Sequence, residues 1–129
     1  MSTQVPDDLK FTETDEWIRV DGEEALIGIS DFAQDALSDI VFVELPKVGA
    51  SFAAGEQFGV VESVKAAADL KMPVGGEVIA VNDVLEASPE KVNSSPYDDG
   101  WMIRIKPSDS AEMDKLMDAA AYTTFLKDR

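Results

Sequence analysis

Short β-prone runs separated by glycine and proline constrain the fold of this chain more than any other feature. Residues 17–20 and 24–29 are rich in Val, Ile, Leu and Trp and flank a turn signal, Asp21-Gly22, which favours a hairpin. Similar runs follow at 40–45, 57–62, 66–72, 77–82 and 101–106. Many short strands with frequent turns are typical of an antiparallel sandwich or small barrel, so we predict a mainly β fold.

Two segments change to a helical period. Between residues 31 and 39, apolar side chains fall on one helical face, and Asp31 with Gln34 resembles a capping box. A second helix is predicted near 110–120, with Asp109 and Glu112 as its capping pair. Residues 83–99 are predicted to be a long polar connection, and residues 122–125 to pack the tail back onto the sheet.

The length of 129 residues suits one domain over 1–129, in which we expect residues 1–8 to be flexible. The chain has 26 acidic and 11 basic residues, a formal net charge of -15 at pH 7. This charge disfavours nucleic acid and anionic membranes as partners and favours proteins with basic docking patches. No apolar run reaches the roughly 20 residues of a membrane span, and no targeting peptide is recognised, so we expect a cytoplasmic monomer.

The residues that are missing exclude most catalytic chemistry. The chain has no Cys and no His, so Ser-His and Cys-His catalysis and thiolate metal sites are impossible, and no metal site is expected. A hydrolase using a pair of carboxylates remains conceivable, but nothing in the sequence marks one pair as special. Any redox or acyl chemistry therefore requires a group attached to the chain.

Lys65 lies in a short stretch between two extended runs, next to Ser63 and followed by small residues at 66–68. A lysine at such a turn extends its flexible stem into solvent, and small neighbours leave room for an enzyme cleft. These features fit a modified lysine, but they fit an ordinary solvated surface lysine as well.

The stretch around Lys65 resembles the lipoyl- and biotin-carrying domains, which present one lysine at a hairpin tip. A Pro-x-x-Gly turn lies just downstream in those families, as residues 73–76 do in this chain. Biotin carriers have Met on both sides of the lysine, whereas Val64 and Ala66 flank Lys65, which argues against biotin. Lys71 precedes Met72, but it lies too close to Pro73 for a tip position.

The wider pattern resembles the H-protein family of the glycine cleavage system over about residues 11–125. The similarity is strongest in Gly-Val-Val-Glu-Ser-Val-Lys-Ala at 59–66. It also includes the segments at 15–20, 28–34, 39–46, 76–78, 92–93 and 96–101. Several separated motifs in the same order are more specific than one lysine signature.

The resemblance implies a lipoyl/biotinyl-carrier-like flattened barrel-sandwich of two antiparallel sheets, with lipoate joined to Lys65 as an amide. It implies a non-catalytic carrier of the aminomethyl group derived from glycine. This group would pass from a pyridoxal-phosphate-dependent glycine decarboxylase, the P protein, to an aminomethyltransferase, the T protein. A dihydrolipoamide dehydrogenase, the L protein, would then reoxidise the carrier, and lipoate-attaching enzymes would modify it. A bacterial form would be cytoplasmic, and a mature eukaryotic form would lie in the mitochondrial matrix.

The resemblance also implies a surface cleft that shelters the loaded arm. Candidates for lining this cleft, or for recognition by the modifying enzyme, are Glu16, Trp17, Ser30, Asp31, Phe32, Glu62 and Ser63. Trp17 and Phe32 fit a core role equally well. The chain departs from the family at Asp15, where His is usual, so any contribution of that His to the cleft is missing.

Two alternatives to the glycine cleavage role stay open from the sequence. The chain could be a lipoyl relay protein that donates lipoate to 2-oxoacid dehydrogenase complexes, which would use the same lysine. It could also be an unmodified acidic interaction module.

Overall fold

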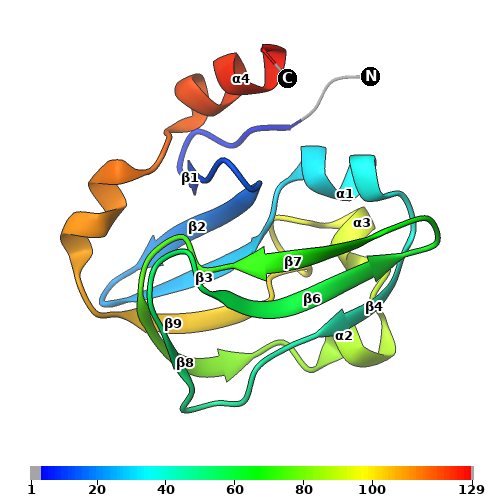
Figure 1. Cartoon of the computed structure of the whole chain (residues 1–129), viewed down its shortest axis with the longest axis horizontal. Coiled ribbons are helices and arrows are strands. Elements are labelled where there is room, and N and C mark those ends of the chain that lie inside the picture. The colour runs from blue at the N-terminus through cyan, green and yellow to red at the C-terminus, as the bar shows by residue number, and fades with distance from the viewer. Residues whose placement is uncertain (1–3, 129) are drawn as a thin grey trace.

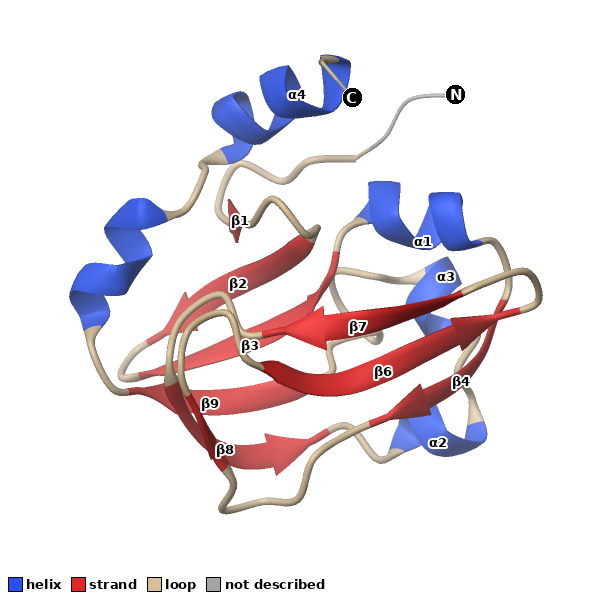
Figure 2. Ribbon diagram, viewed as in Figure 1, coloured by secondary structure: helices blue, strands red, loops and turns tan. Residues whose placement is uncertain are grey.

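Two antiparallel sheets form the framework of the protein, described by a computed structural model over residues 4–128 (Figure 2). The strands are Lys10–Phe11 (β1), Glu16–Asp21 (β2), Glu24–Ile29 (β3), Ile40–Glu44 (β4), Ser51–Phe52 (β5), Gln57–Ser63 (β6), Ala67–Lys71 (β7), Gly76–Val81 (β8) and Ile103–Pro107 (β9). Six strands form one sheet in the order β1-β2-β3-β9-β8-β5, and three form the other in the order β4-β6-β7. The predicted mainly β fold with two antiparallel sheets is confirmed.

The main hydrophobic core lies between the two sheets. Ile27 on β3 and Ile103 on β9 pair across the larger sheet and are fully buried. They belong to the same buried cluster as Val61 on β6 and Leu70 on β7, from the smaller sheet. Because side chains alternate along a strand, the opposite face of β6 and β7 is left toward solvent.

A second core joins the two ends of the chain. Phe11 on β1 stacks on Tyr122 of helix α4 (Ala119–Lys127), with 4.4 Å between ring centroids. Trp17 lies in the same cluster and covers Gly28 on the neighbouring strand, where a Cβ atom would approach the indole to 2.8 Å. The predicted packing of residues 122–125 against the sheet is thus observed.

Helix α1 (Asp31–Leu37) follows β3 and confirms the helix predicted near 31–39. Its cap is Ser30 rather than Asp31, since the Ser30 hydroxyl accepts a hydrogen bond from the Ala33 amide at 3.2 Å. The predicted capping box was therefore wrong by one residue. Asp31 instead accepts from the side-chain amide of Gln34 at 2.8 Å.

The C-terminal helix exists, but not over the predicted residues 110–120. Asp109 caps only a short 3-10 helix, Ser110–Lys115. Met117 then exchanges two backbone hydrogen bonds with Phe11, at 2.8 and 2.9 Å, which commits its backbone to an extended bridge. The Asp118 side chain caps α4 by accepting a hydrogen bond from the Ala121 amide. α4 therefore begins at Ala119, close to the end of the helix predicted near 110–120.

The connection predicted over residues 83–99 contains two short helices, α2 (Val84–Ala87) and α3 (Lys91–Ser94). Each buries one apolar residue, Leu85 and Val92 respectively. The side chain of Asn93 accepts from the Ile40 amide at 2.9 Å, so α3 also fixes the start of β4.

The expected flexibility of residues 1–8 stays a prediction, and residues 1–3 lie outside the described residues. At Gln4 the backbone amide donates to Asp31 at 2.8 Å, and the carbonyl accepts from the Tyr97 hydroxyl at 2.6 Å. Among the helices of residues 4–128, none is long and apolar enough to cross a membrane.

Candidate functional site

Lys65 belongs to the turn between β6 and β7, and this turn lies at the edge of the molecule (Figure 1). Glu62 pairs with Ala67, and the Ser63 amide donates to the Ala66 carbonyl at 2.7 Å. Val64 and Lys65 are left as the two residues of the loop. The strands thus hold a lysine at the tip of a tight hairpin, with its backbone fixed on both sides.

The Ser63 side chain organises this turn. Two-residue hairpin loops usually need positive φ angles, which neither Val64 nor Lys65 has. The Ser63 hydroxyl accepts from the Lys65 amide at 3.3 Å and from the Ala66 amide at 3.0 Å, and it donates to the Ala66 carbonyl at 3.1 Å. The hydroxyl thereby provides hydrogen-bond partners for backbone groups of the loop. In a glycine-rich turn these groups would bond to one another.

Lys65 and its nearest neighbours at the tip are exposed to solvent. Lys65, Ala66 and Ala67 are exposed, and Val64 is 65% exposed. The Val64 amide donates to the Asp39 carbonyl at 3.1 Å, which anchors the loop to the segment before β4. A primary amine on a flexible stem, with small neighbours and a fixed backbone, suits acylation by an enzyme that closes around it.

A cleft of about 170 Å³ lies between α1 and β7. Four of its lining residues are polar or charged, and the other eight are apolar. Its lining residues are Thr14, Asp15, Glu16, Ile29, Phe32, Ala33, Ala36, Leu37, Val61, Ala68, Asp69 and Leu70. Because Ala68 lies on the strand that leaves the hairpin tip, a long flexible arm on Lys65 could fold back along β7 into this cleft.

Glu16 is the most perturbed acid of the cleft. It is 1% exposed, and its Oε1 accepts from the hydroxyls of Thr12, at 2.8 Å, and Thr14. Its Oε2 accepts from the Lys71 amide at 3.3 Å. Burial raises the pKa of Glu16 from 4.5 to about 7, outweighing these hydrogen bonds, and the neighbouring Asp15 carboxylate acts in the same direction.

Asp15 is held by the C-terminal helix. Its φ is 75°, a left-handed conformation that Asp tolerates better than most residues. The Tyr122 hydroxyl donates to Asp15 Oδ1 at 2.8 Å and lies 2.7 Å from the Ser30 hydroxyl. Burial, together with the Asp15 carboxylate, raises the pKa of Tyr122 far above its usual range, so the phenol stays protonated as a donor.

The structure separates the predicted site residues into groups. Glu16 and Phe32 line the cleft, whereas Glu62 and Ser63 lie on the hairpin itself. Trp17 is a core residue, fully buried, with its indole N–H donating to the Pro96 carbonyl at 3.0 Å.

Ser30 and Asp31 lie at the start of α1 and do not line the cleft. Ser30 is buried and connects the helix start to Tyr122. The Asp31 amide donates to the Tyr97 hydroxyl at 2.9 Å. Both residues therefore support the wall rather than form it.

Thr14 and Asp69 are cleft residues that the sequence reasoning missed. Asp69 precedes the buried Leu70 on β7, so its alternation pattern could have marked it as a surface residue near the tip. No comparable signal existed for Thr14. Its position depends on a turn in which the Asp15 amide donates to the Thr12 carbonyl at 3.1 Å.

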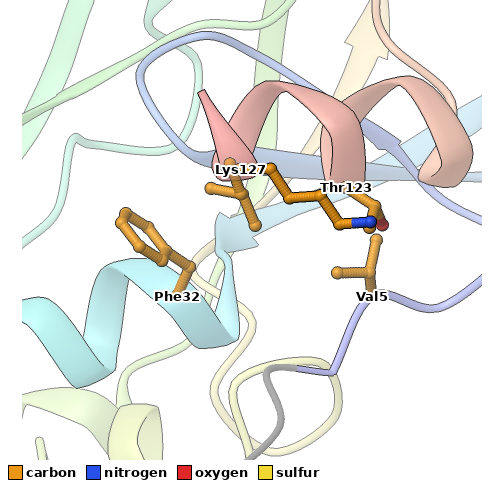
Figure 3. Close-up of a pocket in the computed structure, with 5 residues that line it drawn as sticks. Val5, Phe32, Thr123 and Lys127 are labelled. Carbon is orange, nitrogen blue, oxygen red and sulfur yellow. The ribbon is translucent and has the colours of Figure 1, made fainter. Parts of the chain in front are cut away.

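A second hollow, of about 500 Å³, lies between α1, α4 and the N-terminal segment (Figure 3). Val5, Phe32, Thr123, Leu126 and Lys127 line it. Lys65 is not among these residues, so this hollow is separate from the hairpin tip. Phe32 lines both hollows, which makes its ring part of the wall between them.

Comparisons with known proteins agree with this geometry. Residues 9–129 match the family described as "Glycine cleavage H-protein". A glycine cleavage system H protein from Symbiobacterium thermophilum is 53% identical over 124 residues, covering 96% of this chain and 97% of the relative. One from Teredinibacter turnerae is 53% identical over 127 residues, covering 98% of both.

A solved structure also resembles the fold over nearly its whole length. The crystal structure of a glycine cleavage system H protein from Mycobacterium marinum superposes with a TM-score of 0.88 at 34% identity. The superposition covers 95% of this chain and 99% of that one. On the strength of the family match, the sequence identities and the shared fold, the chain belongs to the glycine cleavage H-protein family.

Proposed function

We propose that Lys65 is the attachment site of a lipoyl group and that the cleft between α1 and β7 shelters the loaded arm. The observation that carries this proposal is an exposed lysine at the tip of a hairpin whose turn is fixed by Ser63. The second lysine nearby, Lys71, belongs to strand β7 rather than to a tip.

Glycine cleavage H-proteins are non-catalytic carriers with lipoate covalently bound to a lysine. The lipoyl group supplies a dithiolane, a strained disulfide that accepts the group to be carried on sulfur. The chain itself contributes no Cys or His to that chemistry. Its own tasks are to hold the arm at high effective concentration near each partner and to keep water from the cargo.

The cleft has the composition that both tasks require. Its apolar wall, which includes Leu37 and Leu70, suits the methylene chain of the arm. Its lining also includes the carboxylate residue Glu16, and the aminomethyl cargo has an amine that is protonated at neutral pH. A buried carboxylate attracts such a cation more strongly than an exposed one, and the cation would in turn favour the ionised form of Glu16.

The chain works with the other components of the glycine cleavage system, as its family does. The specific partners that we propose are the P, T and L proteins and a lipoate-attaching enzyme. The net charge of -15 favours brief, salt-sensitive encounters with basic surfaces. Because the similar proteins named above come from bacteria, we also propose that the chain acts in the cytoplasm.

The test is reconstitution with purified glycine decarboxylase and glycine labelled in its carboxyl carbon. The lipoylated chain should support release of labelled carbon dioxide, and Lys65→Arg should abolish it. Lys71→Arg, a matched control on the neighbouring strand, should retain it. Full activity of Lys65→Arg would refute the assignment.

The contribution of Glu16 to protecting the cargo from water is tested by a separate measurement, the rate of cargo hydrolysis. We expect the cargo on a loaded Glu16→Gln carrier to hydrolyse faster at pH 8, where Glu16 of the natural chain is ionised. The difference should shrink below pH 7, because protonation then neutralises Glu16. Equal hydrolysis rates at pH 8 would remove Glu16 from the sheltering role while leaving Lys65 as the attachment site.

A further inference from the structure

Exposed apolar side chains gather around the hairpin that carries Lys65. In the described chain, the exposed large hydrophobic residues are Val20, Val41, Phe42, Val48, Val64 and Val84. Val41, Phe42 and Val64 flank the tip, and we call these three residues the tip patch. Val64 is bonded through its amide to Asp39, and Ser63 pairs with Ile40, which sets the loop beside the start of β4.

A β-bulge explains why two consecutive residues of β4 are exposed. The register of β4 against β6 shifts between Ile40 and Phe42, with Val41 as the extra residue. Regular alternation would turn one of Val41 and Phe42 inward, but they are 53% and 47% exposed. Bulges often re-aim side chains beside functional sites. β4 is also an edge strand of its sheet, so no neighbouring strand covers it on the outer side.

Carboxylates lie among the apolar residues on the outer face of this sheet. Phe42 pairs with Glu62, and Glu62 pairs with Ala67 on β7. In the next row, Glu44 pairs with Val60. Glu44 and Glu62 are both exposed, so they flank the tip patch with negative charge. The basic residue in these three strands is Lys71, at the end of β7 away from the tip.

We propose that the tip patch, with Glu62 and Glu44 at its border, is the docking surface for the enzyme that acylates Lys65. This inference rests on the proposed function of Lys65. The complementary surface on that enzyme is an apolar pocket with Lys or Arg at its rim. An apolar core with aromatic residues and a polar rim is the usual arrangement of a protein interface.

The acylating enzyme, rather than a later partner, occupies the tip patch because the unmodified lysine side chain reaches only a short distance from the backbone. The unmodified side chain is short, and the acyl donor must lie within bonding approach of Nζ. The active site of the acylating enzyme must therefore lie directly over the tip. In that position the enzyme contacts Val64 and the adjoining face of β4. Enzymes that act at the far end of a lipoyl arm meet the cargo at a distance from this surface.

The test follows lipoylation of the full chain by a purified lipoate-attaching enzyme, with lipoate and ATP, as a shift in intact mass with time. We expect Phe42→Ala to lower kcat/KM about tenfold, mainly through KM, because an anchor and not a reacting group is lost. Val20→Ala, an equally exposed strand residue on the other sheet, should stay within about twofold of the natural chain. Glu62→Lys should also raise KM, most strongly at low salt, and Glu23→Lys in the β2–β3 turn should not.

Phe42 is about half exposed, so its replacement should lower the unfolding midpoint only slightly. If the midpoint falls further, Val64→Ser in the loop carries the same test. Lipoylation of these variants at the natural rate would overturn the proposal, as would normal lipoylation combined with a defect only toward glycine decarboxylase. Failure of the natural chain to accept lipoate would instead refute the proposed function of Lys65.

Discussion

The Tyr122 hydroxyl donates a hydrogen bond of 2.8 Å to the Asp15 carboxylate, 107 residues away in the sequence. Tyr122 lies on the last helix, and Asp15 lines the cleft beside Glu16. The same hydroxyl lies 2.7 Å from the Ser30 side chain, which caps α1 on the opposite wall of the cleft. The C-terminal helix thus joins Asp15 in the cleft to the start of α1.

Tyr122→Phe should weaken this junction while keeping the aromatic stack on Phe11. The change removes the phenol from two buried side-chain partners, so we expect the free energy of unfolding to fall by about 1–3 kcal/mol. Urea denaturation followed by circular dichroism measures this. Phe125→Leu, on the same helix but half-buried, serves as a control for general loosening of α4. An unchanged stability of Tyr122→Phe would show that the phenol contacts do not hold α4 in place.

Glu16 should make the protein less stable as the pH rises from about 4.5 to about 7. Its pKa is raised on folding, so the folded chain binds the Glu16 proton more tightly than the unfolded chain does. The stabilising effect of that proton is complete below the unfolded pKa and lost as the pH passes the folded pKa. The size of this loss is at most about 3 kcal/mol.

The measurement is the free energy of unfolding at pH 5 and at pH 8, for the natural chain and for Glu16→Gln. Gln cannot ionise, so the decrease between the two pH values should be smaller in the variant by the amount that Glu16 contributes. Other titrating groups are common to both proteins and cancel in the comparison. Identical decreases would mean that Glu16 titrates near 4.5 and is not buried as an acid.

Ser63→Ala should loosen the hairpin tip without unfolding the sheets. The substitution removes three hydrogen bonds of the turn, all made by one half-exposed hydroxyl. We expect the amide protons of Lys65 and Ala66 to exchange with solvent several-fold faster, in line with a loss of about 1 kcal/mol of local stability. Ser63→Thr retains a hydroxyl and should restore slow exchange. Unchanged exchange in Ser63→Ala would mean that the strands alone fix the turn.

The sheets could be predicted from the sequence because each strand is encoded by its own residues. The β-prone runs predicted at 57–62 and 66–72 form β6 and β7, and each contributes a buried residue, Val61 and Leu70, to the core. Family resemblance marked Lys65 as the candidate attachment site, and its exposed position at the tip follows from the turn between those two strands.

The parts that could not be predicted depend on contacts between distant segments. The burial of Glu16 requires β7, whose Lys71 amide meets it across 55 residues. The start of α4 is set by the bridge between Met117 and Phe11, which no local capping signal reveals. Asp15 stands out in the sequence comparison with the H-protein pattern. Its partner Tyr122 is 107 residues away, so the contact is visible only in the folded chain.

The most direct test of the account is the intact mass of the native protein, purified from cells able to make lipoate, with the modified peptide then sequenced by fragmentation. The account predicts a mass heavier by one lipoyl group, located on Lys65. The increment should be absent from Lys65→Arg and present in Lys71→Arg. A native mass without the group, or a lipoyl group located on another lysine, would contradict it.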